Sequence, residues 1–248
     1  MKTFYKRVMY LMIILMICPI FDIGTIANEM PAKTHKISGK NIAFIGDSLT
    51  SSTGMKKYID VIKENTNANC YNFGVNESAI AINDIRENSF IARYKDIFSK
   101  YPKDSFDIIV IFGGVNDCAY NVPLGDMSTG NHTFVGALSE VVYNMQSHYP
   151  KAKIVLMTPL IATYNGYMFD YTKNNEHLFL EDYRQGIRLV AKMLGAVVYD
   201  TNMYSGLNPN NGYMSETYYS SREDGVHPNE EGHKRIAEPL INLLDNLY

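Results

Sequence analysis

Short apolar runs along the chain alternate with longer segments in which apolar residues recur at helical spacing. The runs are dense in Ile, Val and Phe, as expected for strands that are buried on both faces of a parallel sheet. The longer segments carry apolar residues at i, i+3, i+4 and i+7, which is the repeat of a helix with one buried face. The predicted strands are residues 41–45, 70–73, 106–112, 153–157 and 196–199.

Three apolar stripes predict the helices that cover this sheet. They comprise Leu138, Val141, Val142 and Met145, then Ile187, Val190, Ala191 and Leu194, and finally Ile236, Leu240 and Leu243. Alternation of strands with helices is typical of a parallel sheet between helix layers. We therefore expect one α/β domain over residues 41–248, a three-layer α/β/α sandwich with a five-stranded parallel sheet.

Three long connections and a polar N-terminal stretch complete the pattern. Residues 28–40 are polar, and we expect them to form a flexible segment. The connections at 113–133, 159–175 and 201–223 are longer than most loops in compact domains, and loops of that length are commonly functional.

The first 27 residues have the order of a secretory signal. Lys2, Lys6 and Arg7 precede an apolar run over residues 8–21, which is shorter than the ~20 residues that a membrane-spanning helix needs. Small residues near Ala27 suit cleavage after it. We therefore expect a secreted or cell-surface protein with no stable membrane insertion after signal cleavage.

Two alternatives for this segment stay open. The signal could be retained as an anchor, or Cys18 could carry a lipid, although Met16 and Ile17 stand where lipoprotein signals have a small residue before the cysteine.

Composition and net charge indicate which classes of partner the chain can bind. The chain is 46% hydrophobic and 20% charged, as in ordinary globular proteins, and its formal net charge is −3 with a pI near 6.1. Nucleic-acid sites need clustered Lys and Arg to neutralise phosphates, so we predict no nucleic-acid partner.

Four short motifs that could carry chemistry each follow a predicted strand or precede the last helix. Ser48 in Gly-Asp-Ser-Leu follows the first strand, where ligands of open α/β sheets bind and where the start of a following helix would favour an oxyanion. The alternative is a serine that only caps this helix. Asp47 beside it suits a structural role, holding the turn through backbone N–H groups.

The next two motifs follow the second and third strands. Gly74 would let a backbone N–H approach a substrate oxygen, and Asn116 could donate its side-chain amide to an oxyanion. Both residues could equally serve ordinary turns. Asp117 suits the same structural role as Asp47.

The fourth motif is Asp224-Gly-Val-His227. Histidine is the usual base for a serine nucleophile, and a carboxylate three residues earlier can orient its ring. Surface polarity and half of a metal site are the alternatives. The coincidence of four ambiguous motifs at one edge of one sheet favours a single catalytic site.

Together these motifs resemble the four blocks of the SGNH hydrolase superfamily, the GDSL-type esterases and lipases, over residues 41–247. The resemblance implies a flavodoxin-like fold. It implies Ser48 as nucleophile, His227 as base and Asp224 as its orienting acid, with Ser48, Gly74 and Asn116 forming the oxyanion hole. Glu77 departs from the pattern, since the second block often has a glycine there.

No cofactor and no metal are predicted, because the remaining histidines form no convincing ligand set. The long loops are rich in Tyr and Asn, which suit sugar rings better than acyl chains. These residues are Tyr120, Tyr164, Tyr167, Tyr171, Tyr204, Tyr213, Tyr218 and Tyr219, with Asn121, Asn165, Asn174 and Asn208. A Tyr- and Asn-rich proteome would give the same pattern.

We therefore expect a secreted serine esterase that hydrolyses a carboxylic ester through an acyl-enzyme and deacetylates a glycan or another small acyl ester. A lysophospholipase or short-chain lipid esterase is the first alternative. An O-acyltransferase that uses the same residues is the second.

Overall fold

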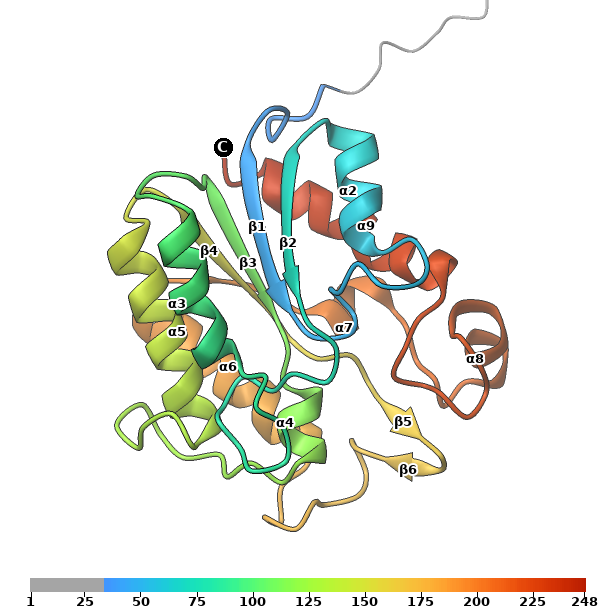
Figure 1. The fold of residues 1–248 in the computed structure, drawn as a ribbon. Helices are drawn as coiled ribbons and strands as arrows, with labels where there is room; N and C mark the ends of the chain where they lie inside the picture. Colours follow the sequence, from blue (N-terminus) through green and yellow to red (C-terminus); the bar gives the residue numbers. More distant parts are fainter. Residues whose placement is uncertain (1–33) are drawn as a thin grey trace, which may run out of the picture. The chain divides into compact units, whose positions relative to one another are not determined.

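The computed structural model describes residues 34–248, and within them five strands pair in one parallel sheet (Figure 1). Their order is β2-β1-β3-β4-β7, and every strand end lies within two residues of its predicted position. The predicted five-stranded sheet is therefore confirmed. The strands are β1 (Asn41–Gly46), β2 (Asn69–Gly74), β3 (Ile108–Phe112), β4 (Lys153–Met157) and β7 (Val197–Tyr199).

Helices cover both faces of the sheet and complete the predicted three layers (Figure 1). Along β1 the side chains alternate, so that Phe44 packs in one core and Ile45 in the other. One face is covered by α3 (Phe90–Lys100), α5 (Phe134–His148) and α6 (Leu180–Leu194). The other is covered by α2 (Tyr58–Thr66) and α9 (Glu230–Asp245).

The chain order places a switch point in the middle of the sheet. After β1 the chain crosses outward to β2 and then returns to pair β3 against the other side of β1. Parallel α/β sheets of this order bind ligands at the carboxyl ends of the strands beside this point.

The long connections fold into short elements near this edge. The structure places three short helices and a hairpin in them, and the sequence predicted none of these elements (Figure 1). These elements are α4 (Val115–Ala119), α7 (Thr201–Ser205), α8 (Gly212–Tyr218) and the hairpin strands β5 (Thr163–Tyr164) and β6 (Tyr167–Met168).

The flexible segment predicted over residues 28–40 is wrong for its described part, residues 34–40. Ile37 is fully buried in the core beneath α2 and α9, and its N–H donates to Asp245 Oδ1 at 3.2 Å. His35 Nδ1 lies 2.7 Å from the other oxygen of the same carboxylate. The predicted signal and residues 28–33 lie outside the described residues.

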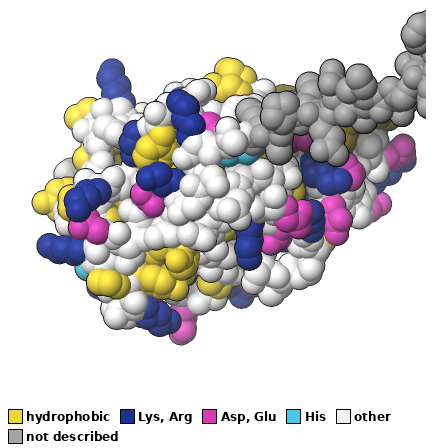
Figure 2. Space-filling view, turned by 90° about the horizontal axis from the view of Figure 1, so that it is seen from above, with side chains coloured by type: hydrophobic (Ala, Val, Ile, Leu, Met, Phe, Trp, Pro, Cys, Tyr) yellow, Lys and Arg dark blue, Asp and Glu magenta, His cyan; other side chains and the backbone are white. Residues whose placement is uncertain are grey.

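Two further observations concern the helices and the charged side chains on the surface. No helix within residues 34–248 is both long and apolar enough to cross a membrane. Figure 2 looks onto the face at the amino ends of the strands, where Lys and Arg side chains are interspersed with Asp and Glu.

Candidate active site

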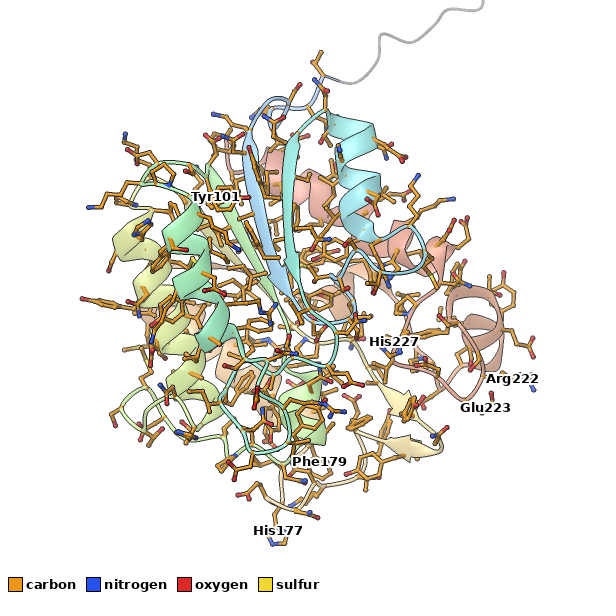
Figure 3. The ribbon with its side chains drawn as sticks, in the orientation of Figure 1. Tyr101, His177, Phe179, Arg222, Glu223 and His227 are labelled. Carbon is orange, nitrogen blue, oxygen red and sulfur yellow. The ribbon has the colours of Figure 1, made fainter. Side chains whose placement is uncertain are left out.

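Three side chains from the predicted motifs form a hydrogen-bonded relay at the carboxyl edge of the sheet. Ser48 Oγ lies 2.9 Å from His227 Nε2, and His227 Nδ1 lies 2.8 and 2.9 Å from the two oxygens of Asp224. Figure 3 shows His227 beyond the carboxyl ends of the strands, on the side of the β5–β6 hairpin. A nucleophile, a base and a group that orients the base require this geometry.

Ser48 sits on a single turn, so the helix predicted directly after it is wrong. The carbonyl of Asp47 accepts hydrogen bonds from the N–H groups of Thr50 and Ser51, at 3.1 and 2.9 Å, and the chain then runs irregularly to α2 at Tyr58. Residues 51–54, which follow the turn directly, are serine, threonine and glycine, which are weak helix formers. Ser48 is therefore neither a helix cap nor placed at a helix dipole.

Asp224 is fixed by the loop that carries His227. Its Oδ1 accepts the backbone N–H groups of Val226 and His227, both at 3.1 Å. Partial burial raises the pKa of Asp224, but the hydrogen bond and charge of His227, together with these two N–H groups, outweigh burial and lower it. The carboxylate is thus kept ionised, as a group that stabilises an imidazolium must be.

Backbone hydrogen bonds tie this loop to the β5–β6 hairpin. The N–H of Asn165 donates to the carbonyl of Glu223 at 3.0 Å, and that of Thr163 donates to the carbonyl of Gly225 at 3.4 Å. A Cβ at position 225 would lie 2.1 Å from Thr163 Oγ1 and 2.5 Å from Cβ of Pro209, so glycine allows the loop and hairpin to approach without displacing either side chain. The hairpin therefore positions the Asp224–His227 pair.

The three predicted oxyanion donors differ in their availability. No described residue accepts a hydrogen bond from the backbone N–H of Ser48. Asn116 donates one N–H to the carbonyl of Ser78 at 3.0 Å, which fixes its amide and leaves the second N–H. The N–H of Gly74, however, donates to Asn72 Oδ1 at 2.8 Å and is thus already engaged.

Gly74 has a packing reason to be glycine. A Cβ there would lie 2.4 Å from the backbone nitrogen of Ser51, in the turn that carries Ser48. Asn72 holds the same turn, since its amide donates to the carbonyl of Thr50 at 2.7 Å. The absence of a side chain at Gly74 therefore allows the turn of Ser48 to pack directly against β2.

The two buried aspartates hold backbone, as predicted. Asp47 accepts the N–H of Leu49 at 3.0 Å, and Asp117 accepts those of Ile80 and Ala81 at 2.9–3.1 Å. Burial raises the pKa of Asp47 to about 6 and that of Asp117 to about 7, against the opposing effect of these hydrogen bonds.

The sequence motifs did not include Arg93, which links the carboxyl ends of two strands by hydrogen bonds. Its guanidinium donates to the carbonyls of Gly46 and Phe73, both at 2.7 Å, and to the hydroxyl of Ser78. The carbonyl of Ser78 in turn orients Asn116. The available signal was an arginine placed among the buried apolar positions of an amphipathic helix, α3.

Ser48, Asn116 and His227 open onto a cavity of about 620 Å³, called the main cleft. Five of its lining residues are apolar, and the others are polar or charged. The apolar ones are Met55, Val115, Ala119, Phe169 and Val226.

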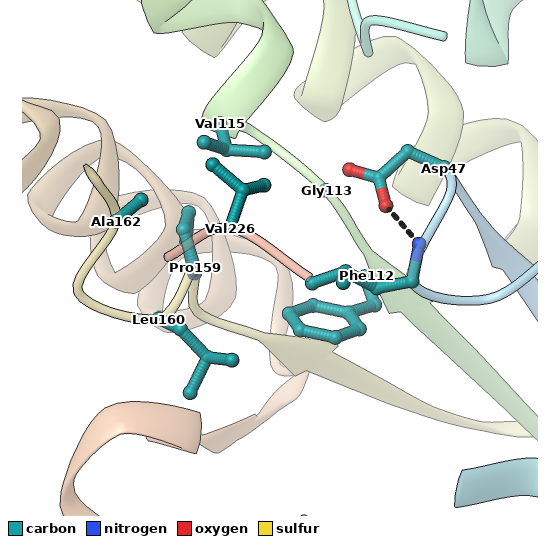
Figure 4. A pocket seen from close by; sticks show the side chains of 9 residues that line it. Asp47, Phe112, Gly113, Val115, Pro159, Leu160, Ala162 and Val226 are labelled. Carbon is teal, nitrogen blue, oxygen red and sulfur yellow. Dashed lines mark hydrogen bonds between the residues drawn. The ribbon is translucent and has the colours of Figure 1, made fainter. Parts of the chain in front are cut away.

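Val115 and Val226 also line a small cavity of about 10 Å³ with Asp47 and residues of the sheet edge (Figure 4). This small cavity has room for one water-sized group.

The tyrosine-rich loops contribute less to the main cleft than the sequence predicts. Of the eight named tyrosines, Tyr120 and Tyr164 line it. Tyr219 is buried in the core, and Tyr204 stacks on Tyr199. Asn174, named with them, is buried and bonds to Tyr183. Within residues 34–248, no group of three or more His, Cys, Asp or Glu residues is arranged to hold a metal ion.

Comparisons with known proteins agree with this geometry. The sequence model of the GDSL-like Lipase/Acylhydrolase family matches residues 44–235. A search of curated proteins finds no match. Among solved structures, the chain is similar to a protein of Lactobacillus plantarum, with 25% identity and a TM-score of 0.74 over 86% of this chain and 99% of the other.

Two further solved structures share the fold. A possible lipase from Chitinophaga pinensis has 20% identity and a TM-score of 0.62, over 84% of this chain and 98% of the other. A variant of Axe2, an acetyl xylan esterase from Geobacillus stearothermophilus, has 19% identity and a TM-score of 0.56, over 83% and 94%. Since the family match spans most of the chain, this protein belongs to the GDSL-like lipase/acylhydrolase family of carboxylic ester hydrolases.

Proposed function

We propose that this chain is an extracytoplasmic serine esterase that removes short acyl groups, acetyl above all, from a glycan. The observation that carries the proposal is the Ser48–His227–Asp224 relay, which opens onto a cleft lined by both polar and apolar side chains. The predicted signal over residues 1–27 supports the location.

In the first half of the reaction, Nε2 of His227 takes the proton of Ser48 Oγ, which attacks the ester carbonyl. The N–H of Ser48 and the second amide N–H of Asn116 stabilise the oxyanion, and Asp224 stabilises the imidazolium. The imidazolium then gives its proton to the leaving alcohol, and the acyl group stays on Ser48.

In the second half, His227 takes a proton from water, which attacks the acyl carbonyl. The carboxylic acid leaves as Ser48 regains its proton. Gly74 can join the oxyanion hole only if its N–H shares or leaves Asn72 Oδ1, so we assign it a smaller share than the other two donors.

Two features support a short acyl group on a polar alcohol. Long acyl chains need a continuous apolar groove. The small apolar cavity that shares Val115 and Val226 with the main cleft has a volume of only about 10 Å³, which is too small for a long chain. The walls of the main cleft offer hydroxyl, amide and charged groups to sugar hydroxyls. Axe2, which shares this fold, is an acetyl xylan esterase, and a glycan ester is therefore a substrate class that the fold can serve.

The test of the nucleophile is hydrolysis of nitrophenyl acetate. We expect Ser48→Ala to lower kcat by several orders of magnitude, with exposed Ser52→Ala as the matched control at the wild-type rate. Asn116→Ala should lower kcat by about 10²–10³ if its amide holds the oxyanion. Near-normal turnover by Ser48→Ala would overturn the proposal.

The acyl group is tested with nitrophenyl esters of two to twelve carbons. We expect kcat/KM to fall as the chain lengthens. A rise would instead indicate a lipid esterase. Transfer of acetyl to an added sugar, in place of release as acetate, would indicate an acyltransferase.

A further inference from the structure

Tyr120 stands between the main cleft and a second cavity. It follows α4 and lines both the main cleft and a cavity of about 340 Å³, called the side cavity. Residues 82–85, 120–123 and His132 line the side cavity. Both volumes lie in the ~300–1,000 Å³ range of small-molecule sites. One residue thus lines two cavities of ligand size.

The ring of Tyr120 is held in place by its hydroxyl. This hydroxyl donates to the carbonyl of Glu77 at 3.1 Å. The half-buried ring packs partly against the core and pairs with no other aromatic ring within residues 34–248. An oriented aromatic ring without an aromatic partner offers a surface on which a sugar can stack.

Glu77 holds this arrangement in a strained conformation. Its φ of +60° lies in the left-handed region, where the Cβ of a residue other than glycine crowds the backbone. Its carboxylate pairs with Arg86 at 2.7 Å, but both side chains are exposed, and such pairs stabilise little. Strain with little stabilisation in return is characteristic of functional sites. Glycine would relieve the strain but would remove the carboxylate from the main cleft.

The side cavity combines groups that recognise sugars. Ile85 is 52% exposed and offers an apolar surface to ring C–H groups. Asp84 is exposed and can accept a hydroxyl, and His132 adds an exposed ring nitrogen. Asn121 uses its side-chain oxygen to accept the N–H of Asn175, which leaves its amide hydrogens to donate.

We propose that the side cavity is a second sugar subsite, so that the substrate is an acetylated oligo- or polysaccharide. The sugar that carries the ester occupies the main cleft beside Ser48, and its neighbour crosses Tyr120 into the side cavity. This inference rests on the proposed function and specifies its substrate class.

The experiment measures kcat and KM of the wild-type chain for O-acetylated xylose, xylobiose and xylotetraose, with nitrophenyl acetate as a reference. We expect KM to fall about tenfold or more from xylose to xylotetraose. Tyr120→Ala and the double variant Asp84→Asn/His132→Leu should each lower the xylotetraose-to-nitrophenyl-acetate ratio of kcat/KM about tenfold. Tyr120→Phe, which keeps the ring, should retain most of the ratio.

The matched control is Tyr143→Ala, which removes an exposed tyrosine on α5. It should keep the wild-type ratio. Equal kcat/KM for xylose and xylotetraose in the wild type, or an unchanged ratio in Tyr120→Ala, overturns the subsite alone. Absence of any Ser48-dependent hydrolysis of these esters overturns the proposed function and the subsite with it.

Discussion

At the scale of single residues, Gly74 and Arg93 shape the site through packing and hydrogen bonds to its backbone. Gly74 makes room for the backbone of the turn that carries Ser48. Arg93 joins the ends of β1 and β2 to Ser78, and through Ser78 to Asn116. Both residues position the nucleophile and the amide that faces the developing charge.

We predict that Gly74→Ala lowers kcat for nitrophenyl acetate by tenfold or more. The added methyl group would meet the backbone of Ser51 and shift the turn of Ser48, and overpacking of this kind destabilises by about 1–3 kcal/mol. Steady-state kinetics and urea unfolding measure the two effects. The control is Gly212→Ala, where a Cβ meets nothing within 4 Å, and equal effects of the two substitutions would contradict the prediction.

We also predict that Arg93→Lys lowers kcat about tenfold, because an ammonium lacks the planar fork that reaches three acceptors. If Arg93 acts through Ser78 and Asn116, its effect should largely disappear in an Asn116→Ala background. A double-mutant cycle on kcat measures this coupling. Strictly additive effects would assign Arg93 to general stability, and exposed Lys100→Ala is the control.

The sequence predicts which residues meet but not how each is bonded. Ser48, Asn116 and the Asp224–His227 pair come together because the carboxyl ends of parallel strands share an edge. The engagement of the Gly74 N–H could not be predicted, since it depends on the rotamer of Asn72. The number of tyrosines that line the main cleft was overestimated, because some loop tyrosines, such as Tyr219, are buried in the core.

At the scale of elements, the contact between α2 and α9 contains a buried histidine. His233 on α9 is fully buried and stacks on Tyr58 of α2, with ring centroids 6.2 Å apart. Neither ring nitrogen has a hydrogen-bond partner. Burial, followed by the charges of Lys57 and His227, lowers the pKa of His233 to about 3. The ring is therefore neutral in the folded protein.

This burial predicts a specific loss of stability in acid. Below the ordinary pKa of 6.5 the unfolded chain protonates His233 while the folded chain does not, so the free energy of unfolding falls as pH drops from about 6.5 towards 3. By pH 5 the loss is about 2 kcal/mol. We predict that His233→Leu abolishes this part of the pH dependence.

Urea unfolding at pH 8 and pH 5 measures the difference. Leucine also removes two unsatisfied polar atoms, so the variant should be at least as stable as the wild type at pH 8. Exposed His132→Leu serves as the control. The same pH slope in wild type and His233→Leu would contradict the assignment.

The five strands of the sheet and the helices α5, α6 and α9 were predicted from the sequence, whereas α2, α3 and the short elements of the long connections were not. The strands are runs of buried β-branched residues, a signal that tertiary contacts reinforce. The β5–β6 hairpin has strands of two residues, too short to show a period, although Asn165-Gly166 at its turn is a strong signal for a type I′ hairpin. Nothing in the spacing revealed that the turn after Ser48 would not continue as a helix.

At the scale of the whole described unit, residues 34–40 join its first strand to its last helix. Ile37 fills the core beneath α2 and α9, and Asp245 near the end of α9 bonds to His35 and to the backbone of Ile37. The polar composition of this stretch concealed one apolar residue that docks. The core therefore includes a residue that lies before the first predicted strand.

We predict that Ile37→Ala lowers the free energy of unfolding by about 2–4 kcal/mol, because it empties a fully buried site. Turnover at 25 °C should be unchanged, since Ile37 precedes the amino end of β1, whereas Ser48 follows its carboxyl end. Urea unfolding checks the stability. Exposed Ser38→Ala should change it by less than about 0.5 kcal/mol, and a similarly small effect of Ile37→Ala would show that this residue is dispensable.

The dependence of the Asp224–His227 loop on the β5–β6 hairpin gives the enzyme a point of failure outside its cores. The nucleophile lies on the turn that directly follows β1, whereas the loop of its base is held in part through Thr163 and Asn165 on an exposed hairpin. A single proteolytic cut at Gly166 would leave both cores intact and loosen the hairpin that helps to hold the base beside Ser48. Inactivation by mild proteolysis or moderate heating should therefore precede unfolding. The protein would then remain folded but inactive.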